Sequence, residues 1–350
     1  MNHRERILAA IRRQPVDRIP TDIWATDEVW EKLRAHLGVS DNLGVYDGLD
    51  IDGIIGIAPP YIGPVCPVKD GIRYDEWGMG YRIQAYETGS YDEQVIFPLA
   101  QAKTVEDLAA FPWPSPDWYD YSALPKLAES YEGRSLQVGY TAIFYWHNRL
   151  RGLEQSLMDP LENPELTRYL VQKVSDFFQE YHTRCFEAAR GLVDSTQVTD
   201  DFGSQNGLLI SPRIFDSFYR APMQRGIDLA HRYDLIVFHH DDGDMRRLLP
   251  RLVEMGIDLL NPIQWRCGGW DLSRLKADYG QKLCFHSAVD NQQTLPFGTP
   301  RDVRREVKTL IETLGSDGTG FIVGPCHNLQ PVTPMENILA LYETAKSWKK

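Results

Sequence analysis

The chain of 350 residues is 43% hydrophobic and 11% aromatic, enough to build the core of one large α/β domain or of two ordinary ones. Its formal net charge of −12 would repel a polyphosphate, which argues against a nucleic-acid partner. The charged N-terminal segment does not have the pattern of a secretory signal, and no apolar run reaches about 18 residues. We therefore expect a cytoplasmic protein without membrane association.

The first third of the chain differs in pattern from the rest. Residues 71–91 alternate aromatic and polar side chains around Gly78 and Gly80, which predicts a β-hairpin. No linker rich in serine, glycine or charge separates this region from the remainder of the chain. We interpret residues 28–125 as an elaboration on a single domain that spans residues 1–350.

From residue 135 onward, short apolar runs alternate with long amphipathic segments, which is typical of repeated βα units around a parallel sheet. The predicted strands span 135–144, 195–201, 235–240, 257–263, 282–289 and 320–326. The predicted helices include 164–191, 211–233, 245–256 and 300–315. Right-handed crossovers lead either to a closed barrel or to an open doubly wound sheet. Because no GxGxxG sequence follows any strand, we predict a (β/α)8 TIM barrel whose main βα units occupy residues 135–350.

Two ligand-type side chains end the predicted strand 235–240. In a (β/α)8 barrel the carboxyl ends of the strands converge on one mouth, where catalysis takes place. His240 and Asp242 are two residues apart, so in extended backbone they project to the same side, as two ligands of one ion must. His239 faces the other way and is interpreted as a packed or hydrogen-bonded histidine.

A pair of aspartates, Asp200 and Asp201, ends the preceding strand before a glycine-containing turn. We expect one carboxylate to enter the mouth and the other to cap the turn or the following helix. Asp201 and His240 are the predicted catalytic residues.

A thiol completes the predicted metal site. The five cysteines are odd in number and contain no CxxC pair, so a disulfide framework is not expected. Cys326, at the end of the last strand, could reach an ion held by His240 and Asp242. Zinc accepts nitrogen, sulfur and oxygen ligands, and these three would leave one position open for substrate or water. In the alternative interpretation, Asp242 caps the turn at Gly243 and binds no metal. Reserve ligands are Glu336, His327 and His286.

Further residues at the strand ends are candidates to bind substrate. Three aromatic side chains could line an apolar pocket, and two polar ones could contact a substrate at the same mouth. They are Trp24, Tyr145, Trp146, Gln205 and His286.

Five stretches of the chain, in family order, carry a resemblance to a known superfamily. They are residues 2–20, 200–215, 240–264, 283–307 and 324–343. On these stretches the chain resembles the uroporphyrinogen decarboxylase superfamily, and specifically its branch of corrinoid-dependent methyltransferases and decarboxylase-like proteins. The resemblance implies a (β/α)8 barrel. It does not imply decarboxylation of uroporphyrinogen, because the arginine-rich motif of the decarboxylase is replaced here by "RIPTDIWATDEVW", with Asp22 and Asp27.

The methyltransferase branch has a zinc site with a His-x-Cys pair and a later Cys. His240 and Cys326 match the family's His and last Cys, whereas Asp242 stands in place of the first Cys. An oxygen ligand makes zinc a stronger Lewis acid and favours an oxygen substrate over a thiol.

The resemblance thus implies a zinc-dependent methyltransferase. It would move a methyl group from a methylated small molecule, such as a methoxylated aromatic, to the corrinoid (cobalamin) of a separate carrier protein. Two alternatives remain open. One is a metal-independent decarboxylase of a smaller acid that uses Asp201, and the other is a non-catalytic accessory protein that binds a corrinoid or tetrapyrrole.

Overall fold

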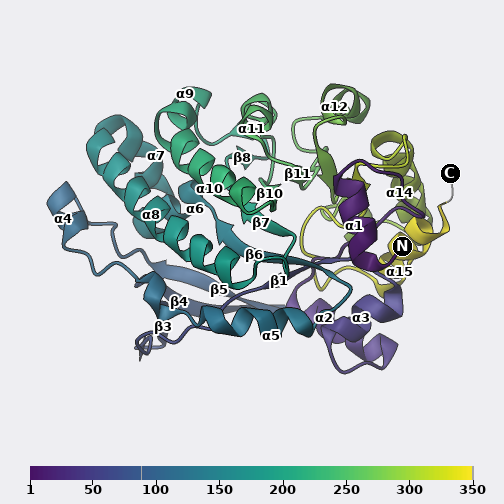
Figure 1. The fold of residues 1–350 in the computed structure, drawn as a ribbon, viewed down its shortest axis with the longest axis horizontal. Helices are drawn as coiled ribbons and strands as arrows, with labels where there is room; N and C mark the ends of the chain where they lie inside the picture. Colours follow the sequence, from purple (N-terminus) through teal and green to yellow (C-terminus); the bar gives the residue numbers. More distant parts are fainter. Residues whose placement is uncertain (88, 349–350) are drawn as a thin grey trace.

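A parallel β-sheet forms the centre of the molecule. The computed structural model describes residues 1–87 and 89–348, and within these residues seven parallel strands lie in the order β1-β6-β7-β10-β11-β12-β13 (Figure 1). Their bounds are β1 Ile54–Ile57, β6 Ser135–Thr141, β7 Ser195–Val198, β10 Ile236–His240, β11 Leu259–Asn261, β12 Cys284–His286 and β13 Phe321–Ile322. All six strands predicted from residue 135 onward are present, each shorter than the apolar run that predicted it.

An irregular segment, residues 20–22, closes the ring. The backbone N–H of Asp22 donates to Val323 O at 2.8 Å on one side, and Gly53 N–H donates to Thr21 O at 2.9 Å on the other. This segment therefore occupies the position between β13 and β1. The predicted barrel of TIM type is confirmed, with one of its eight positions filled by backbone too irregular to count as a strand.

Helices surround the barrel, and most of them cover the outside of the sheet. They are α1 His3–Ile11, α2 Asp27–Leu37, α3 Asn42–Leu49, α4 Val105–Ala109, α5 Leu124–Glu129, α6 Ile143–Arg151, α7 Leu153–Glu162, α8 Pro164–Ala188, α9 Pro212–Ile214, α10 Arg220–Arg232, α11 Leu249–Met255, α12 Leu272–Tyr279, α13 Thr294–Phe297, α14 Pro300–Leu314 and α15 Met335–Ser347. Short helical turns span Pro116–Trp118 and Tyr121–Ala123. The helix predicted at 211–233 is divided by a π-helical segment at Phe215–Tyr219 between α9 and α10. Figure 1 shows both chain termini on the same side of the molecule.

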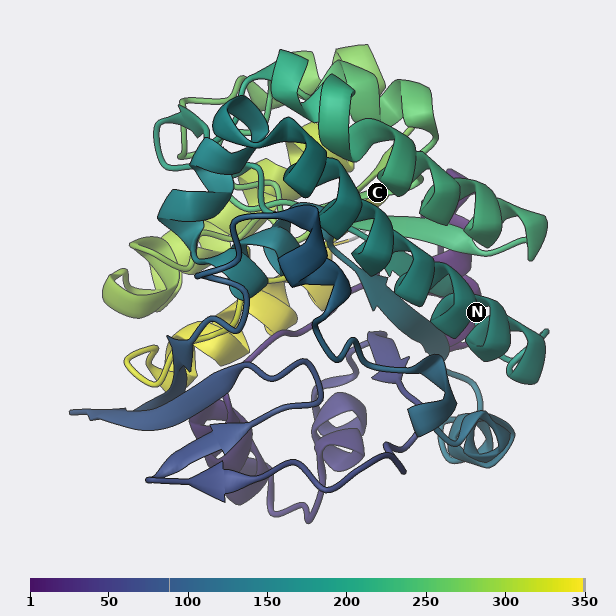
Figure 2. The same ribbon diagram turned by 90° about the vertical axis from the view of Figure 1, so that its left-hand side faces the viewer.

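The N-terminal elaboration carries an antiparallel sheet of its own. Its strands are β2 Val68–Lys69, β3 Ile72–Tyr74, β4 Gly80–Tyr86 and β5 Gly89–Ile96, and they lie along the lower edge of the molecule in Figure 2. The predicted hairpin around Gly78 and Gly80 is confirmed by the antiparallel pairing of β3 with β4. Residue 88 of the predicted range lies outside the described residues. The predicted boundary 28–125 is too inclusive, because β1 lies within it and belongs to the barrel.

One end of the barrel is closed by α1. Apolar side chains of this helix form one buried cluster with the layer of barrel-interior side chains nearest to the helix. The cluster consists of Ile7, Ala10, Ile11, Ile54, Phe238, Leu259, Cys284 and Ile322. Because this plug fills the amino ends of the strands, the carboxyl ends are the accessible mouth. No helix within residues 1–87 and 89–348 has both the length and the apolar character needed to span a membrane.

A buried histidine between α8 and β6 makes stability depend on pH. His182 is fully buried, its Nδ1 lies 3.0 Å from Thr141 Oγ1, and burial lowers its pKa to about 3. In the unfolded chain the pKa of histidine is about 6.5, so the unfolded state binds the proton first as pH falls. His182 therefore has no destabilising effect above about pH 6.5, the pKa in the unfolded chain, and it lowers the free energy of unfolding as the pH falls from there toward the pKa in the folded state.

We predict that His182→Gln removes part of this decline. The free energy of unfolding of the wild type should fall more steeply between pH 6 and 5, by up to about 1.4 kcal/mol per pH unit relative to the variant. Urea unfolding at a series of pH values measures it, and His36→Gln, at an exposed position of α2, is the control. Parallel profiles for the wild type and His182→Gln would contradict this assignment.

Candidate metal centre and adjoining aromatic cavity

Hydrogen bonds of its backbone fix the position of His240, the last residue of β10. Its N–H donates to Thr199 Oγ1 at 2.8 Å, and its carbonyl accepts from Asp200 N–H at 3.0 Å. Because successive side chains of a strand point to opposite faces, the imidazoles of His239 and His240 lie on opposite faces of β10. His239 is fully buried with its Nδ1–H donating to Val198 O at 2.9 Å, so the interpretation of His239 as a packed histidine is confirmed.

Three side chains with metal-ligand atoms meet at the mouth of the barrel. His240, Asp242 and His327 each offer one atom, and these atoms all lie within 4.8 Å of one another. His240 Nε2 lies 3.9 Å from Asp242 Oδ1, and His327 Nε2 lies 3.6 Å from Asp242 Oδ2. Ligand atoms around tetrahedral zinc, with bonds of about 2.0–2.2 Å, are about 3.3–3.6 Å apart. If these ligand atoms moved slightly closer together, their separations would match those around a bound zinc ion.

The carboxylate of Asp242 does not cap the turn. A turn cap would accept from Asp244 N–H, two residues on, but this group donates to Ser204 O at 2.8 Å, and Gly243 N–H donates to Gln264 Oε1 at 2.6 Å. Asp242 Oδ1 is shielded from solvent and has no hydrogen-bond partner in the part of the chain that the structure describes. A buried acceptor without a donor is unfavourable, and a cation would satisfy it. The turn-cap alternative for Asp242 is not supported.

The predicted third ligand, Cys326, lies outside this group. Its Sγ points to Ile263 O at 3.5 Å, and burial raises the pKa of the thiol well above its usual value. His327 lies in the same bend, and its Nε2 faces Asp242 Oδ2 at 3.6 Å, on the side of the mouth. His327, held in reserve by the sequence analysis, is the ligand candidate that replaces Cys326. Burial lowers its pKa and so favours the neutral form that binds metal. Glu336 is exposed in the first turn of α15.

A chain of hydrogen bonds orients His240. Its Nδ1 lies 2.6 Å from Asn261 Oδ1, Asn261 Nδ2 lies 2.6 Å from His286 Nδ1, and His286 Nε2 lies 2.9 Å from Asp22 Oδ2. An amide oxygen and a carboxylate only accept, so the donors are Nδ1–H of His240 and Nε2–H of His286. The lone pair of His240 then resides on Nε2, which faces the group. Such a second layer of hydrogen bonds is what orients histidine ligands of metals.

His286 serves in this chain and is not placed to bind substrate. It is fully buried between Asn261 and Asp22, so the prediction of a substrate contact from His286 is wrong. Asn261 stands at the end of β11, but spacing alone assigned it no role in the site. Its partner in β10 is His240 itself, a pairing that depends on strand register and is not readable from spacing.

The two aspartates after β7 have separate tasks. Asp200 is buried and accepts from the N–H groups of Phe144 and Tyr145, at 2.8 and 2.7 Å, at the start of α6. The helix that it caps is thus the one before β7, and not the following one. Asp201 Oδ1 faces the mouth, 3.6 Å from His240 Nε2. One carboxylate enters the mouth, as expected, but the expectation that the other caps the turn or the following helix is wrong, because Asp200 caps α6.

Trp24 forms one wall beside the metal-ligand group. Its ring centroid lies 5.3 Å from that of His240 and 5.9 Å from that of His327. The other predicted substrate-binding residues lie in different parts of the molecule. Gln205 is exposed in the turn between β8 (Gly203–Ser204) and β9 (Gly207–Leu208), where its Oε1 accepts from Cys267 Sγ at 3.1 Å. Tyr145 packs beside the guanidinium of Arg149.

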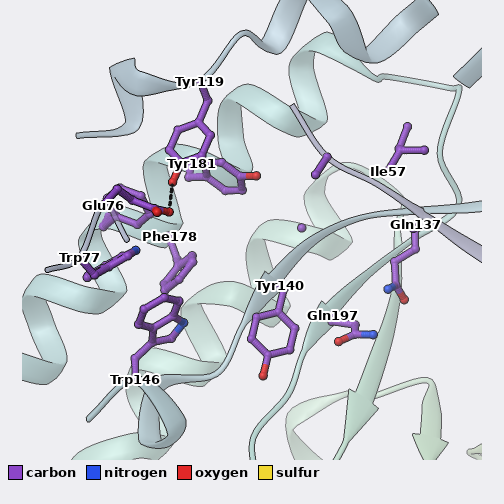
Figure 3. A pocket seen from close by; sticks show the side chains of 14 residues that line it. Ile57, Glu76, Trp77, Tyr119, Gln137, Tyr140, Trp146, Phe178, Tyr181 and Gln197 are labelled. Carbon is purple, nitrogen blue, oxygen red and sulfur yellow. Dashed lines mark hydrogen bonds between the residues drawn. The ribbon is translucent and has the colours of Figure 1, made fainter. Parts of the chain in front are cut away.

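Trp146 lines a cavity of about 440 Å³ that is also lined by residues of β1, β6 and β7 (Figure 3). Strand register relates this cavity to the metal-ligand group. Tyr140 pairs with Gln197, and Gln197 pairs with Phe238, which lies on the same face of β10 as His240. A bulge at Gly139 turns Tyr140 inward: Gly139 has φ +88°, and a β-carbon there would lie 2.7 Å from the ring of His182.

The chain is similar to known proteins over most of its length. The family model described as uroporphyrinogen decarboxylase (URO-D) matches residues 100–348. The uroporphyrinogen decarboxylase of Aliivibrio salmonicida (strain LFI1238) is 23% identical over 197 residues, or 53% of this chain and 51% of the relative. That of Prochlorococcus marinus (strain MIT 9211) is 26% identical over 193 residues, or 53% and 49%. The chain thus spans about half the length of the curated relatives it matches.

A solved structure matches over nearly the whole chain. It is described as a methyltransferase from Methanosarcina mazei, and it superposes with a TM-score of 0.68 at 18% identity, covering 99% of this chain and 98% of that one. At this identity the likeness establishes the fold.

Replacing Asn261 tests the orienting hydrogen bonds. We predict that Asn261→Leu, which keeps the branching and the number of heavy atoms but removes both hydrogen bonds, weakens zinc binding by about 10–100-fold, because His240 loses the acceptor that fixes its tautomer. Asn261→Asp keeps an oxygen for His240 Nδ1–H and should retain more affinity than the leucine variant. Competition titration against a chelator measures both, with thermal unfolding to verify the fold. Wild-type zinc affinity in Asn261→Leu would refute the orienting role.

Proposed function

The chain belongs to the uroporphyrinogen decarboxylase family, and from this premise we propose that it is a metal-dependent methyltransferase. The proposed reaction moves a methyl group from a small methylated molecule to the corrinoid of a separate carrier protein. The observation that carries the proposal is the grouping of His240, Asp242 and His327 around an unsatisfied carboxylate oxygen at the mouth of the barrel. The similarity to the Methanosarcina mazei methyltransferase supports the same branch of the family.

Zinc is the metal we propose for this group. Two imidazole nitrogens and a carboxylate oxygen are ligands that zinc accepts, and three protein ligands leave one position for substrate. Bound there, zinc would supply positive charge that stabilises the oxygen left behind when the methyl group departs. Because His327 replaces the expected thiolate, the ligand set donates less electron density, which favours an oxygen leaving group such as that of a methoxylated aromatic.

The protein's own side chains would supply orientation and proton handling. Asn261 fixes His240 with its Nε2 lone pair toward the mouth, and Trp24 covers one side of the group. Asp201 Oδ1, 3.6 Å from His240 Nε2, is the carboxylate we assign to hold the proton that the departing oxygen takes up.

The charges at the mouth disfavour a polycarboxylate substrate. Within residues 1–87 and 89–348, neither Asp201 nor Asp242 pairs with a lysine or arginine, and their ion-pair neighbours are His240 and His327. A substrate bearing several carboxylates would meet like charge there. This argues against uroporphyrinogen itself, whereas decarboxylation of a smaller acid through Asp201 remains the runner-up.

Variants at Asp242 test the proposal. We predict that Asp242→Ala loses zinc affinity and methyl transfer together, each by about 100-fold, because one ligand is removed. Asp242→Cys should retain zinc but transfer a methyl group from an ether donor more slowly, since sulfur reduces the Lewis acidity of zinc. Metal analysis and an assay of methyl transfer to a corrinoid protein measure these effects.

The control is Cys326→Ser, which should keep both zinc and activity because Cys326 lies outside the ligand group. Zinc retained in full by Asp242→Ala would refute the metal assignment. Turnover by metal-depleted protein that releases carbon dioxide would instead establish the decarboxylase, and binding of a corrinoid without any turnover would establish the accessory protein.

A further inference from the structure

The cavity shown in Figure 3 has a wall made almost entirely of aromatic rings. The ring of Trp77 packs against three of the others, with centroid distances of 4.4 Å to Trp146, 4.8 Å to Phe177 and 5.9 Å to Phe178. Tyr119 and Tyr181, whose centroids lie 4.9 Å apart, continue the wall. Its volume of about 440 Å³ falls within the range of small-molecule sites, about 300–1,000 Å³.

A carboxylate is set among these rings without a counter-charge. Glu76 lines the cavity, and its Oε1 accepts a hydrogen bond from the Tyr119 hydroxyl at 2.8 Å (Figure 3). Across the described chain no lysine, arginine or histidine forms an ion pair with Glu76. Burial and then the negative charge of Glu76 raise the pKa of Tyr119 above its usual value, so this charge acts on the aromatic wall.

Two polar atoms on the cavity's lining have no partner of their own. Gln137 Oε1 and Trp146 Nε1 are buried, and neither forms a hydrogen bond with any described residue. Figure 3 shows Gln137 across the cavity from the aromatic rings. A ligand with a polar arm would satisfy such groups, and an apolar one would leave them unpaired.

We propose that this cavity binds a small organic cation of the methylated ammonium class. The positive charge would lie against the negative faces of the rings and near the Glu76 carboxylate, with a polar arm toward Gln137. An uncharged aromatic ligand could stack on the same wall but would leave Glu76 without a counter-charge, and an anion would be repelled. The inference goes beyond the proposed function, because it concerns binding alone and holds whether or not the protein transfers methyl groups.

Choline and its uncharged carbon analogue, in which a tert-butyl group replaces trimethylammonium, separate these ligand classes. We predict saturable binding of choline to the full-length protein, and binding of the carbon analogue at least about tenfold weaker. Glu76→Gln should weaken choline by about tenfold and leave the carbon analogue unchanged. Isothermal titration calorimetry measures each affinity, and Glu129→Gln, in the last turn of α5, is the matched control that should match the wild type.

Two further variants keep the test decisive. Tyr119→Phe removes the hydroxyl that orients Glu76 with little change in shape, and should also weaken choline if Glu76→Gln fails to fold. Asp242→Ala should bind choline normally, so failure of the metal proposal is distinguishable from failure of this one. Equal affinity for choline and its carbon analogue, or no saturable binding of choline by the wild type, would overturn the proposal.

Discussion

The hydrogen bond between His240 Nδ1–H and Asn261 Oδ1, at 2.6 Å, is the interaction on which the candidate site depends. It exists because β10 and β11 are parallel neighbours in which His240 and Asn261 are directly paired. It places the imidazole lone pair on Nε2, at the mouth of the barrel, where Asp242 and His327 converge. The buried chain through His286 to Asp22 fixes the orientation of the Asn261 amide, so side chains from β10, β11, β12 and the segment 20–22 together determine one lone pair.

The convergence of acidic groups has an energetic consequence. Asp201 and Asp242 both face His240 without a lysine or arginine partner among the described residues, and Asp242 Oδ1 is left without a donor. Bringing these groups together costs stability unless a cation lies between them. A bound cation would offset this cost and would stabilise the folded state by mass action. The arrangement is therefore better explained by a ligand of positive charge than by the needs of the fold.

The sequence predicted those features that depend on local periodicity. Alternating apolar runs and amphipathic segments predicted repeated βα units, and the absence of a GxGxxG sequence together with the family resemblance favoured the barrel over an open sheet. A spacing of two residues was enough to place His240 and Asp242 on one face. Features that depend on three-dimensional register were missed. After Gly324 and Pro325 the phase of the chain is not set by a strand, so the choice between Cys326 and His327 as the residue facing the mouth could not be made. Residues 20–22 close the barrel through irregular backbone that has no sequence signal.

Anomalous X-ray scattering at the zinc absorption edge, from crystals of zinc-loaded protein, tests the central claim most directly. We predict one anomalous peak within about 2.0–2.2 Å of His240 Nε2, His327 Nε2 and a carboxylate oxygen of Asp242, with Cys326 Sγ outside the coordination sphere. A metal bonded to Cys326 in place of His327, or no metal at this group in zinc-loaded crystals, would contradict it.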